Sequence, residues 1–204
     1  MTGSAPEDSG VDASALRTEA LSLIQSTRVD DLLKERFGDC SIVGSVALDL
    51  MSWRDIDLYV PVERSDAQRF IDVLPAIYGA FAGAAHTVVR ATFNDEWAVP
   101  RGSYGTGYYC GFRVRTPAAV AWKIDLWGWG RGTYEAKLQE HRSLAGRLAR
   151  ADRDLILKLK QETQQLPEFR KEITSWDIYQ FVLAGEGTRL AELQAFARNG
   201  GRRP

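Results

Sequence analysis

Three aspartates carry the chemistry that the sequence suggests. Asp55 and Asp57 occupy alternate positions of residues 55–60, and apolar side chains occupy the positions between them. This alternation is typical of a strand with one buried face, so both carboxylates should project from the other face, with backbones about 7 Å apart. Asp125 lies on the polar face of a similar alternating run, residues 120–127. If the two strands are neighbours, the carboxylates could hold two divalent cations ~4 Å apart, the spacing used for in-line phosphoryl displacement.

A glycine-containing turn precedes the acidic pair. Residues 40–43 form a short, mainly apolar run, Gly44 and Ser45 follow, and residues 46–51 have the composition of a short helix. The sequence therefore predicts a strand, a turn and a helix. The unpaired N–H groups of such a turn suit a phosphate oxygen, and a glycine lets a ligand approach the backbone closely. Gly44 and Ser45 are thus candidate phosphate-binding residues.

Basic side chains near the acidic strands are further candidates for contacting phosphate. Lys123 lies two residues before Asp125 on the same strand face, so its ammonium group should sit near the metals and the phosphates. Arg113 lies on the polar face of residues 107–115, which together with residues 87–93 predict a β-hairpin. Arg113 could reach triphosphate oxygens, although a solvated arginine on an edge strand fits the pattern equally well.

Together these residues resemble the nucleotidyltransferase superfamily, whose best-known member is DNA polymerase β. The resemblance rests on a glycine turn, an acidic pair and a later acid, which here are Gly44-Ser45, Asp55-Ile56-Asp57 and Asp125. It covers roughly residues 40–130 and implies transfer of a nucleoside monophosphate from a nucleoside triphosphate to a hydroxyl group. It also implies that the three aspartates are the catalytic residues and the ligands of Mg²⁺, with two ions expected and Mn²⁺ as an alternative.

Two branches of that superfamily are similar to residues 44–50: antibiotic nucleotidyltransferases of the aminoglycoside and lincosamide kind, and abortive-infection toxin nucleotidyltransferases. The first likeness implies a small-molecule acceptor, and the second implies tRNA. Toxin-like relatives use a lysine on the first helix after the catalytic sheet to contact the triphosphate, and Lys158 resembles it. Only residues 51–54 lie between this stretch and the acidic pair, whereas the relatives have a longer polar insert at that place.

The composition indicates the kind of fold and the kind of acceptor to expect. The chain has 204 residues, of which 45% are hydrophobic, enough for one packed domain or a core with an appendage. Its 26 basic and 27 acidic residues give a net charge of −1, so no overall field attracts nucleic acid. We therefore expect a small-molecule acceptor, with tRNA as the alternative.

The sequence also predicts the environment of the protein. It has no leader-like N-terminus and no apolar run near 18 residues, so we expect a cytoplasmic protein without membrane contact. Cys40 and Cys110 have no neighbouring Cys or His at metal-ligand spacing, which predicts buried free thiols. The oligomeric state stays open.

We expect an α/β (α+β) fold, in which a small mixed sheet with helices on one face is followed by helices that help to close a cleft. Residues 1–11 are small and polar and predict a disordered tail. The strand patterns lie within residues 12–133, the expected nucleotidyltransferase core. From residue 134 apolar side chains recur at helical spacing, which predicts a helical C-terminal subdomain over residues 134–204.

Three other features bear on the site. Residues 127–132, Trp-Gly-Trp-Gly-Arg-Gly, predict a loop at its mouth, whose tryptophans could stack on a base or pack inside the protein. Lys160 lies near Lys158 on a charged helical face, which predicts a solvated side chain. His141 falls on an apolar stripe, which is more typical of a hydrogen-bonded core histidine than of a catalytic base.

Two other functions fit parts of the pattern. A glycosyltransferase uses Asp-x-Asp with a metal and a nucleotide sugar, but this function requires neither the Gly-Ser turn nor Asp125. A non-catalytic module of the same fold would bind a nucleotide without transferring any part of it.

Overall fold

A computed structural model of the chain describes residues 12–99, 105–167 and 173–200. Within them five strands form one mixed sheet with the order β1-β2-β5-β4-β3, in which β2 and β5 run parallel and the other neighbours antiparallel. The strands are β1 (Ser41–Val43), β2 (Asp55–Val62), β3 (Thr87–Asp95), β4 (Gly107–Arg115) and β5 (Ala121–Gly130). The predicted small mixed sheet is therefore confirmed. The tail predicted at residues 1–11 lies outside the described residues.

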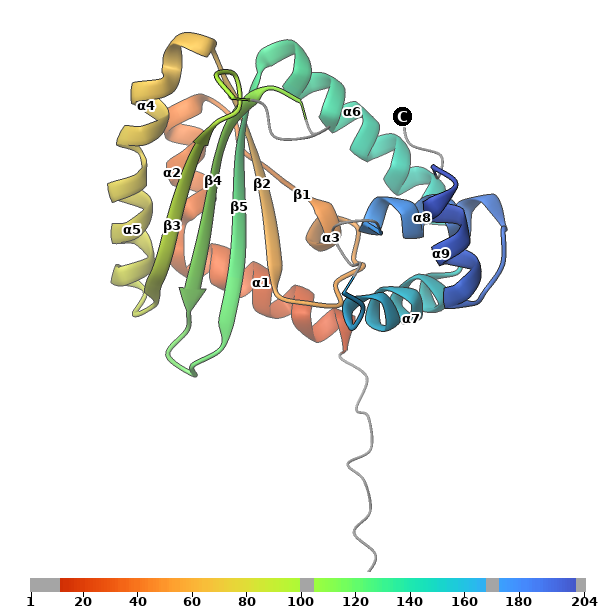
Figure 1. Cartoon of the computed structure of the whole chain (residues 1–204). Coiled ribbons are helices and arrows are strands. Elements are labelled where there is room, and N and C mark those ends of the chain that lie inside the picture. The colour runs from red at the N-terminus through yellow and green to blue at the C-terminus, as the bar shows by residue number, and fades with distance from the viewer. Residues whose placement is uncertain (1–11, 100–104, 168–172, 201–204) are drawn as a thin grey trace, which may run out of the picture.

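One face of the sheet is covered by helices from the first half of the chain (Figure 1). They are α1 (Ala13–Thr27), α2 (Val29–Phe37), α4 (Ala67–Asp72) and α5 (Leu74–Gly83). Ile56, Leu58 and Ile124 are among the strand residues buried beneath them. Each large apolar side chain removed from water in this way contributes roughly 1.5–3 kcal/mol, so this layer fixes the strands that carry the acids.

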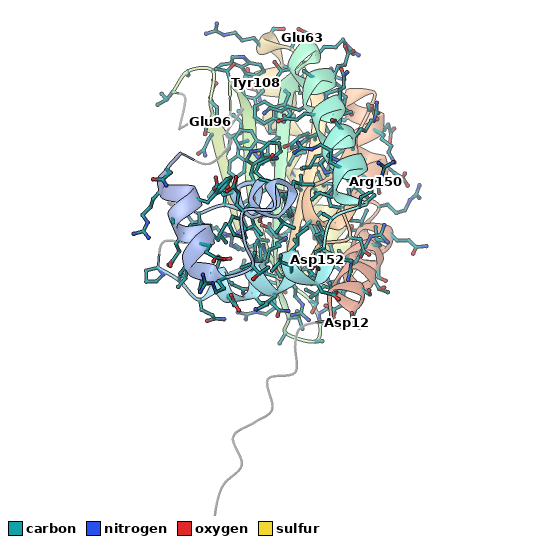
Figure 2. All side chains as sticks on the ribbon, turned by 90° about the vertical axis from the view of Figure 1, so that its right-hand side faces the viewer. Asp12, Glu63, Glu96, Tyr108, Arg150 and Asp152 are labelled. Carbon is teal, nitrogen blue, oxygen red and sulfur yellow. The ribbon has the colours of Figure 1, made fainter. Side chains whose placement is uncertain are left out.

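The helices of the second half pack together on the other side of the sheet (Figure 1). They are α6 (Arg131–Leu148), α7 (Arg153–Gln164), α8 (Ser175–Ala184) and α9 (Leu190–Arg198), with the short α3 (Gly44–Ala47) between them and the strands. Figure 2 views the molecule from this side, with Arg150 and Asp152 marking the turn between α6 and α7. Their apolar side chains form a cluster separate from that beneath the sheet.

The helical C-terminal half agrees with the prediction, whereas its division from the core at residue 133 stays a prediction. α6 begins at Arg131 and contacts both β2 and β5, so the helical layer is anchored directly on the sheet. Among the described helices, none combines the length and the apolar character that crossing a membrane would need.

Residues 127–132 are not the predicted loop. β5 continues three residues beyond Trp127, and α6 begins at the next residue. A Cβ atom on Gly128 would lie 2.6 Å from Cε2 of Phe70, so this glycine leaves room for α4 to pack on the strand. Trp127 and Trp129 lie on the opposite face, where their rings stack with centroids 4.6 Å apart. The glycine provides packing space within a strand, which composition alone does not distinguish from a turn.

Candidate active site

The parallel pairing of β2 with β5 brings the three aspartates together. Asp57 lies opposite Asp125 in this pairing, and Asp55 lies opposite Lys123. One carboxylate oxygen from each aspartate lies within 4.8 Å of the others. The alternation of two distant stretches predicts this convergence, and it is the geometry that a divalent cation needs.

The three carboxylates share a poorly solvated space. Asp55 and Asp125 are each 8% exposed, and Asp57 is partly buried. Burial, and then the charges of Asp55 and Asp125, raise the pKa of Asp57 to about 8. Burial also raises the pKa of Asp125, against the opposing effect of Lys123. Because like charges this close ionise together only at a cost, the donor set fits a hard divalent cation such as Mg²⁺.

Lys123 supplies a positive charge within this cluster. Its ammonium group lies 3.2 Å from Oδ1 of Asp55 and contacts Oδ2 of Asp125. Burial acts to lower the pKa of Lys123, but the two carboxylates outweigh it and raise the pKa above the ordinary value. The lysine is therefore charged and bound to the acids, and its contact with phosphate stays a prediction.

Gly44 is required by the position of Asp57. The glycine has a φ of +64°, in the left-handed region, and a Cβ atom on it would lie 2.1 Å from Oδ2 of Asp57. A residue with a side chain could neither adopt this backbone without strain nor leave the carboxylate in place. The glycine thus admits a carboxylate of the protein itself, where the sequence predicts a closely approaching ligand. Ser45 is buried and does not line the cavity described next, so its contact with phosphate stays a prediction.

The acids line a cavity between the sheet and helices α6 and α8. Its volume is about 530 Å³, the size of a site for a small molecule or a nucleotide. Helix α6 contributes Lys137, Glu140 and His141 to the wall. Much of the remaining wall is aromatic: Trp53, Tyr59, Tyr109, Trp127, Trp129, Trp176 and Tyr179. Flat rings of this kind provide stacking surfaces for a nucleobase.

Two of the predicted phosphate contacts lie away from this cavity. Lys158 is exposed on α7, where its ammonium group lies 3.8 Å from Oε1 of Glu162. Arg113 is exposed on β4 and lies opposite Lys123 in the pairing with β5, but it does not line the cavity. Contact of either residue with phosphate therefore stays a prediction.

Lys160 is a candidate site residue that the sequence analysis did not predict. The prediction of a solvated side chain is wrong, because Lys160 is fully buried on α7. Its ammonium group donates to the backbone carbonyl of Leu50 and, at 3.3 Å, to the hydroxyl of Tyr179. Burial lowers its pKa to about 7, against the opposing charges of Asp57 and Asp55. A buried amine thus faces the acidic cluster.

The spacing of the buried residues along α7 indicates that Lys160 faces inward. The other buried residues of the helix are Ile156, Leu159 and Thr163, so Lys160 occupies the position four residues after the first of them. A lysine on an apolar helical stripe is a buried amine rather than part of a solvated face.

His141 reaches the cavity wall from α6. Burial lowers its pKa, and a hydrogen bond with the backbone of Gly44 partly offsets this. Its buried Nε2 atom has no hydrogen-bond partner within the part of the chain that the structure describes. The predicted core histidine is therefore a cavity residue anchored at the glycine turn.

Comparison with solved structures identifies the fold. A variant of the Cid1 poly(U) polymerase bound to MgATP aligns with a TM-score of 0.50 and 15% sequence identity, covering 82% of this chain and 49% of that chain. Terminal uridylyl transferase 4 from Trypanosoma brucei aligns with a TM-score of 0.47 and 15% identity, covering 85% and 56% of the two chains. The chain thus spans about half the length of these structures. No protein-family model and no curated protein sequence matches it.

The Cid1 poly(U) polymerase is a member of the DNA polymerase β-like nucleotidyltransferase superfamily. The alignment extends over 82% of this chain. The chain therefore has the fold of the DNA polymerase β-like nucleotidyltransferases.

Proposed function

We propose that the chain is a metal-dependent nucleotidyltransferase that moves a nucleoside monophosphate from a nucleoside triphosphate to a hydroxyl group. The observation that carries the proposal is the convergence of Asp55, Asp57 and Asp125 at the wall of an aromatic-lined cavity. Solvated acidic clusters are common, but two of these acids are buried, and the pKa values of Asp57 and Asp125 are raised. The fold shared with the Cid1 poly(U) polymerase adds support.

Each residue of the site has a proposed role. The three aspartates would hold Mg²⁺ as two ions, with Mn²⁺ as an alternative; when bound, the ions would neutralise phosphate charge and lower the pKa of the acceptor hydroxyl. Asp125 is best placed to accept the hydroxyl proton. Lys160 does not line the cavity, and its charge, which interacts with Asp57 and Asp55, would offset the negative charge of these acids. Such a reaction needs positioning and charge neutralisation, without a covalent intermediate.

RNA is the proposed acceptor, with tRNA as a specific case, in place of the small molecule expected from the net charge. The structural neighbour with a TM-score of 0.50 is a poly(U) polymerase. A net charge of −1 is compatible with a local basic surface. Basic residues recur along α6 and just beyond it: Arg131, Lys137, Arg142, Arg147 and Arg150. The helix also carries Glu135 and Glu140, so its net charge is positive, and Lys137 reaches the cavity wall. A positive helix beside the cavity favours a phosphate-rich acceptor.

A transfer assay tests the proposal. The chain is incubated with Mg²⁺ and each nucleoside triphosphate, labelled at the α-phosphate, and with total tRNA, a short RNA, or a panel of aminoglycosides and lincosamides. Label transferred to RNA with release of pyrophosphate is the expected result. Transfer to the antibiotics alone would assign a small-molecule acceptor. In a parallel incubation with a nucleotide sugar in place of the triphosphate, release of nucleoside diphosphate would indicate a glycosyltransferase. Calorimetry that detects no joint binding of Mg²⁺ and triphosphate would overturn the proposal.

Lys123→Met is expected to increase the affinity for a divalent cation about tenfold when no nucleotide is present. The ammonium group contacts the carboxylates of Asp55 and Asp125 that the cation would use, so its removal eliminates a competitor. Calorimetric titration with Mn²⁺ at pH 8 measures the change. The matched control is Lys137→Met, because the Lys137 ammonium lies 4.5 Å from the centroid of the Trp129 ring. Equal Mn²⁺ affinities of Lys123→Met and the wild type would contradict the expectation.

A cytoplasmic location accords with the proposal. Cys40 and Cys110 are buried free thiols, as the sequence predicts. Burial raises the pKa of each to about 12, so neither is a reactive thiolate. Free thiols persist in reducing compartments, which supports the cytoplasm as the site of action.

A further inference from the structure

Tyr109 contacts Asp125 from the neighbouring strand. In the pairing of β4 with β5, Tyr109 lies opposite Trp127, whereas Asp125 lies opposite Gly111. The side chain of Tyr109 therefore extends along its strand, and its hydroxyl donates to Oδ1 of Asp125 at 3.0 Å. The ring packs against Trp127, with centroids 4.8 Å apart. Ring packing and a hydrogen bond thus fix the hydroxyl beside the carboxylate.

Gly111 leaves the space that this hydroxyl occupies. A Cβ atom on Gly111 would lie 2.4 Å from the Tyr109 hydroxyl oxygen and 3.0 Å from Oγ1 of Thr92. The φ of this glycine lies outside the left-handed region, so backbone conformation does not require it. A glycine inside a strand weakens the strand and often marks a close approach of another group. Tyr109 and Gly111 therefore act as one structural unit at Asp125.

The two oxygens of Asp125 have different partners. Oδ1 accepts from Tyr109, and Oδ2 accepts from Lys123, which also contacts Asp55. Oδ2 is therefore the oxygen on the side of the other acids. A tyrosine hydroxyl carries its proton at neutral pH and here donates it to the carboxylate. Donors in this position orient a ligating carboxylate.

We propose that Tyr109 is a positioning residue that extends over Gly111 to hold Asp125 by Oδ1, leaving Oδ2 to bind the metal and to accept the proton of the acceptor. The inference rests on the proposed function, because it assigns Asp125 a role in that reaction. Asp125 would keep one orientation when Lys123 leaves the acids, since the neutral donor remains on the other oxygen.

The test compares Tyr109→Phe with Tyr108→Phe. Tyr108 precedes Tyr109 on β4 and lies on the other face of the sheet, near Glu63 (Figure 2). Its hydroxyl donates to the backbone carbonyl of Arg64 at 2.6 Å. Each variant therefore loses one tyrosine hydrogen bond, but only Tyr109→Phe loses it at an acid. Thermal unfolding of both variants reports whether they are folded.

Calorimetry then measures the affinity for Mn²⁺ in the presence of a non-hydrolysable ATP analogue, alongside kcat and KM of transfer. Tyr109→Phe is expected to weaken Mn²⁺ binding about 10–100-fold and to lower kcat more than it changes KM. Tyr108→Phe should leave the Mn²⁺ affinity unchanged. Wild-type affinity in Tyr109→Phe would overturn the inference and leave the proposed function standing. A wild-type chain that binds no Mn²⁺ would overturn both.

Gly111→Ala completes a double-mutant cycle. Its methyl group would displace the Tyr109 hydroxyl, so the single variant should also lose Mn²⁺ affinity. In the Tyr109→Phe background no hydroxyl remains to be displaced, and the further loss should be smaller than in the wild type. Additive losses would show that the two residues act independently and would overturn the inference. If Gly111→Ala does not fold, the comparison of the two phenylalanine variants decides.

Discussion

Asp57→Asn is expected to abolish transfer while making the metal-free protein more stable. Loss of one metal-binding carboxylate should reduce the transfer rate at least ~10³-fold, equivalent to about 4 kcal/mol of transition-state stabilisation. Stability should change in the opposite direction, because burial, and then the charges of Asp55 and Asp125, raise the pKa of Asp57 to about 8. The amide of Asn takes up no proton on folding, so the substitution removes this cost and should add ~1–2 kcal/mol, or about 3–6 °C in Tm for a chain of this size.

The raised pKa of Asp57 also determines how the stability of the folded protein changes with pH. Between about pH 4 and pH 8 the folded protein keeps a proton on Asp57 that the unfolded chain releases, so stability falls as the pH rises through this window. Lys160, with its pKa lowered to about 7, adds an opposite slope above that pH. Asp125, whose pKa is raised, and His86 and His141, whose pKa values burial lowers, also titrate near this range. The contribution of Asp57 is therefore the difference between the wild type and Asp57→Asn in thermal unfolding without divalent ions between pH 5 and pH 7, and the fall with pH should be smaller in the variant.

A surface substitution controls for the change from Asp to Asn. Asp72 is exposed at the end of α4, where its carboxylate accepts a hydrogen bond from the side chain of Gln68. Asp72→Asn should leave both transfer and the pH curve unchanged. Transfer by Asp57→Asn at the wild-type rate would rule out the metal-binding role of Asp57, and an unchanged Tm and pH curve would show that folding does not raise the pKa of this carboxyl.

The fold was predictable where strands have one buried face. In β2 and β5 large apolar residues alternate with acids, and this period of two indicates both the strands and the face that carries Asp55, Asp57 and Asp125. The register was not predictable, because it depends on the parallel pairing of two strands that are distant in sequence. That pairing sets Asp57 opposite Asp125, and a slip by one residue would move one acid to the buried face.

The contacts of the basic residues were harder to derive. Lys123 was predictable as a neighbour of the acids, but its ammonium group forms ion pairs with Asp55 and Asp125 instead of remaining free for phosphate. Lys158 and Lys160 lie two residues apart on one helix, yet the first is exposed and the second is fully buried. Which of them faces inward depends on how α7 packs, and the spacing of its apolar residues is the only local signal.

Gly44→Ala is expected to reduce transfer about 100-fold or more. The added methyl carbon would lie 2.1 Å from Oδ2 of Asp57, which is more than 1 Å inside an ordinary contact, so the carboxylate must move. A displacement of about 1 Å in a catalytic group can cost 10²-fold in rate. The positive φ of +64° adds strain of ~1 kcal/mol, which lowers stability without any effect on chemistry.

Gly185→Ala separates these two effects, because Gly185 shares the backbone conformation of Gly44 but not its surroundings. It has a φ of +69° at the end of α8, and a Cβ atom there meets nothing within 4 Å. Gly185→Ala should therefore lose about 2–4 °C in Tm from backbone strain alone, while only Gly44→Ala loses transfer and Mn²⁺ affinity. Equal loss of transfer in the two variants would attribute the defect to backbone strain. Full transfer by Gly44→Ala would mean that Asp57 acts from a position other than the one against the glycine turn.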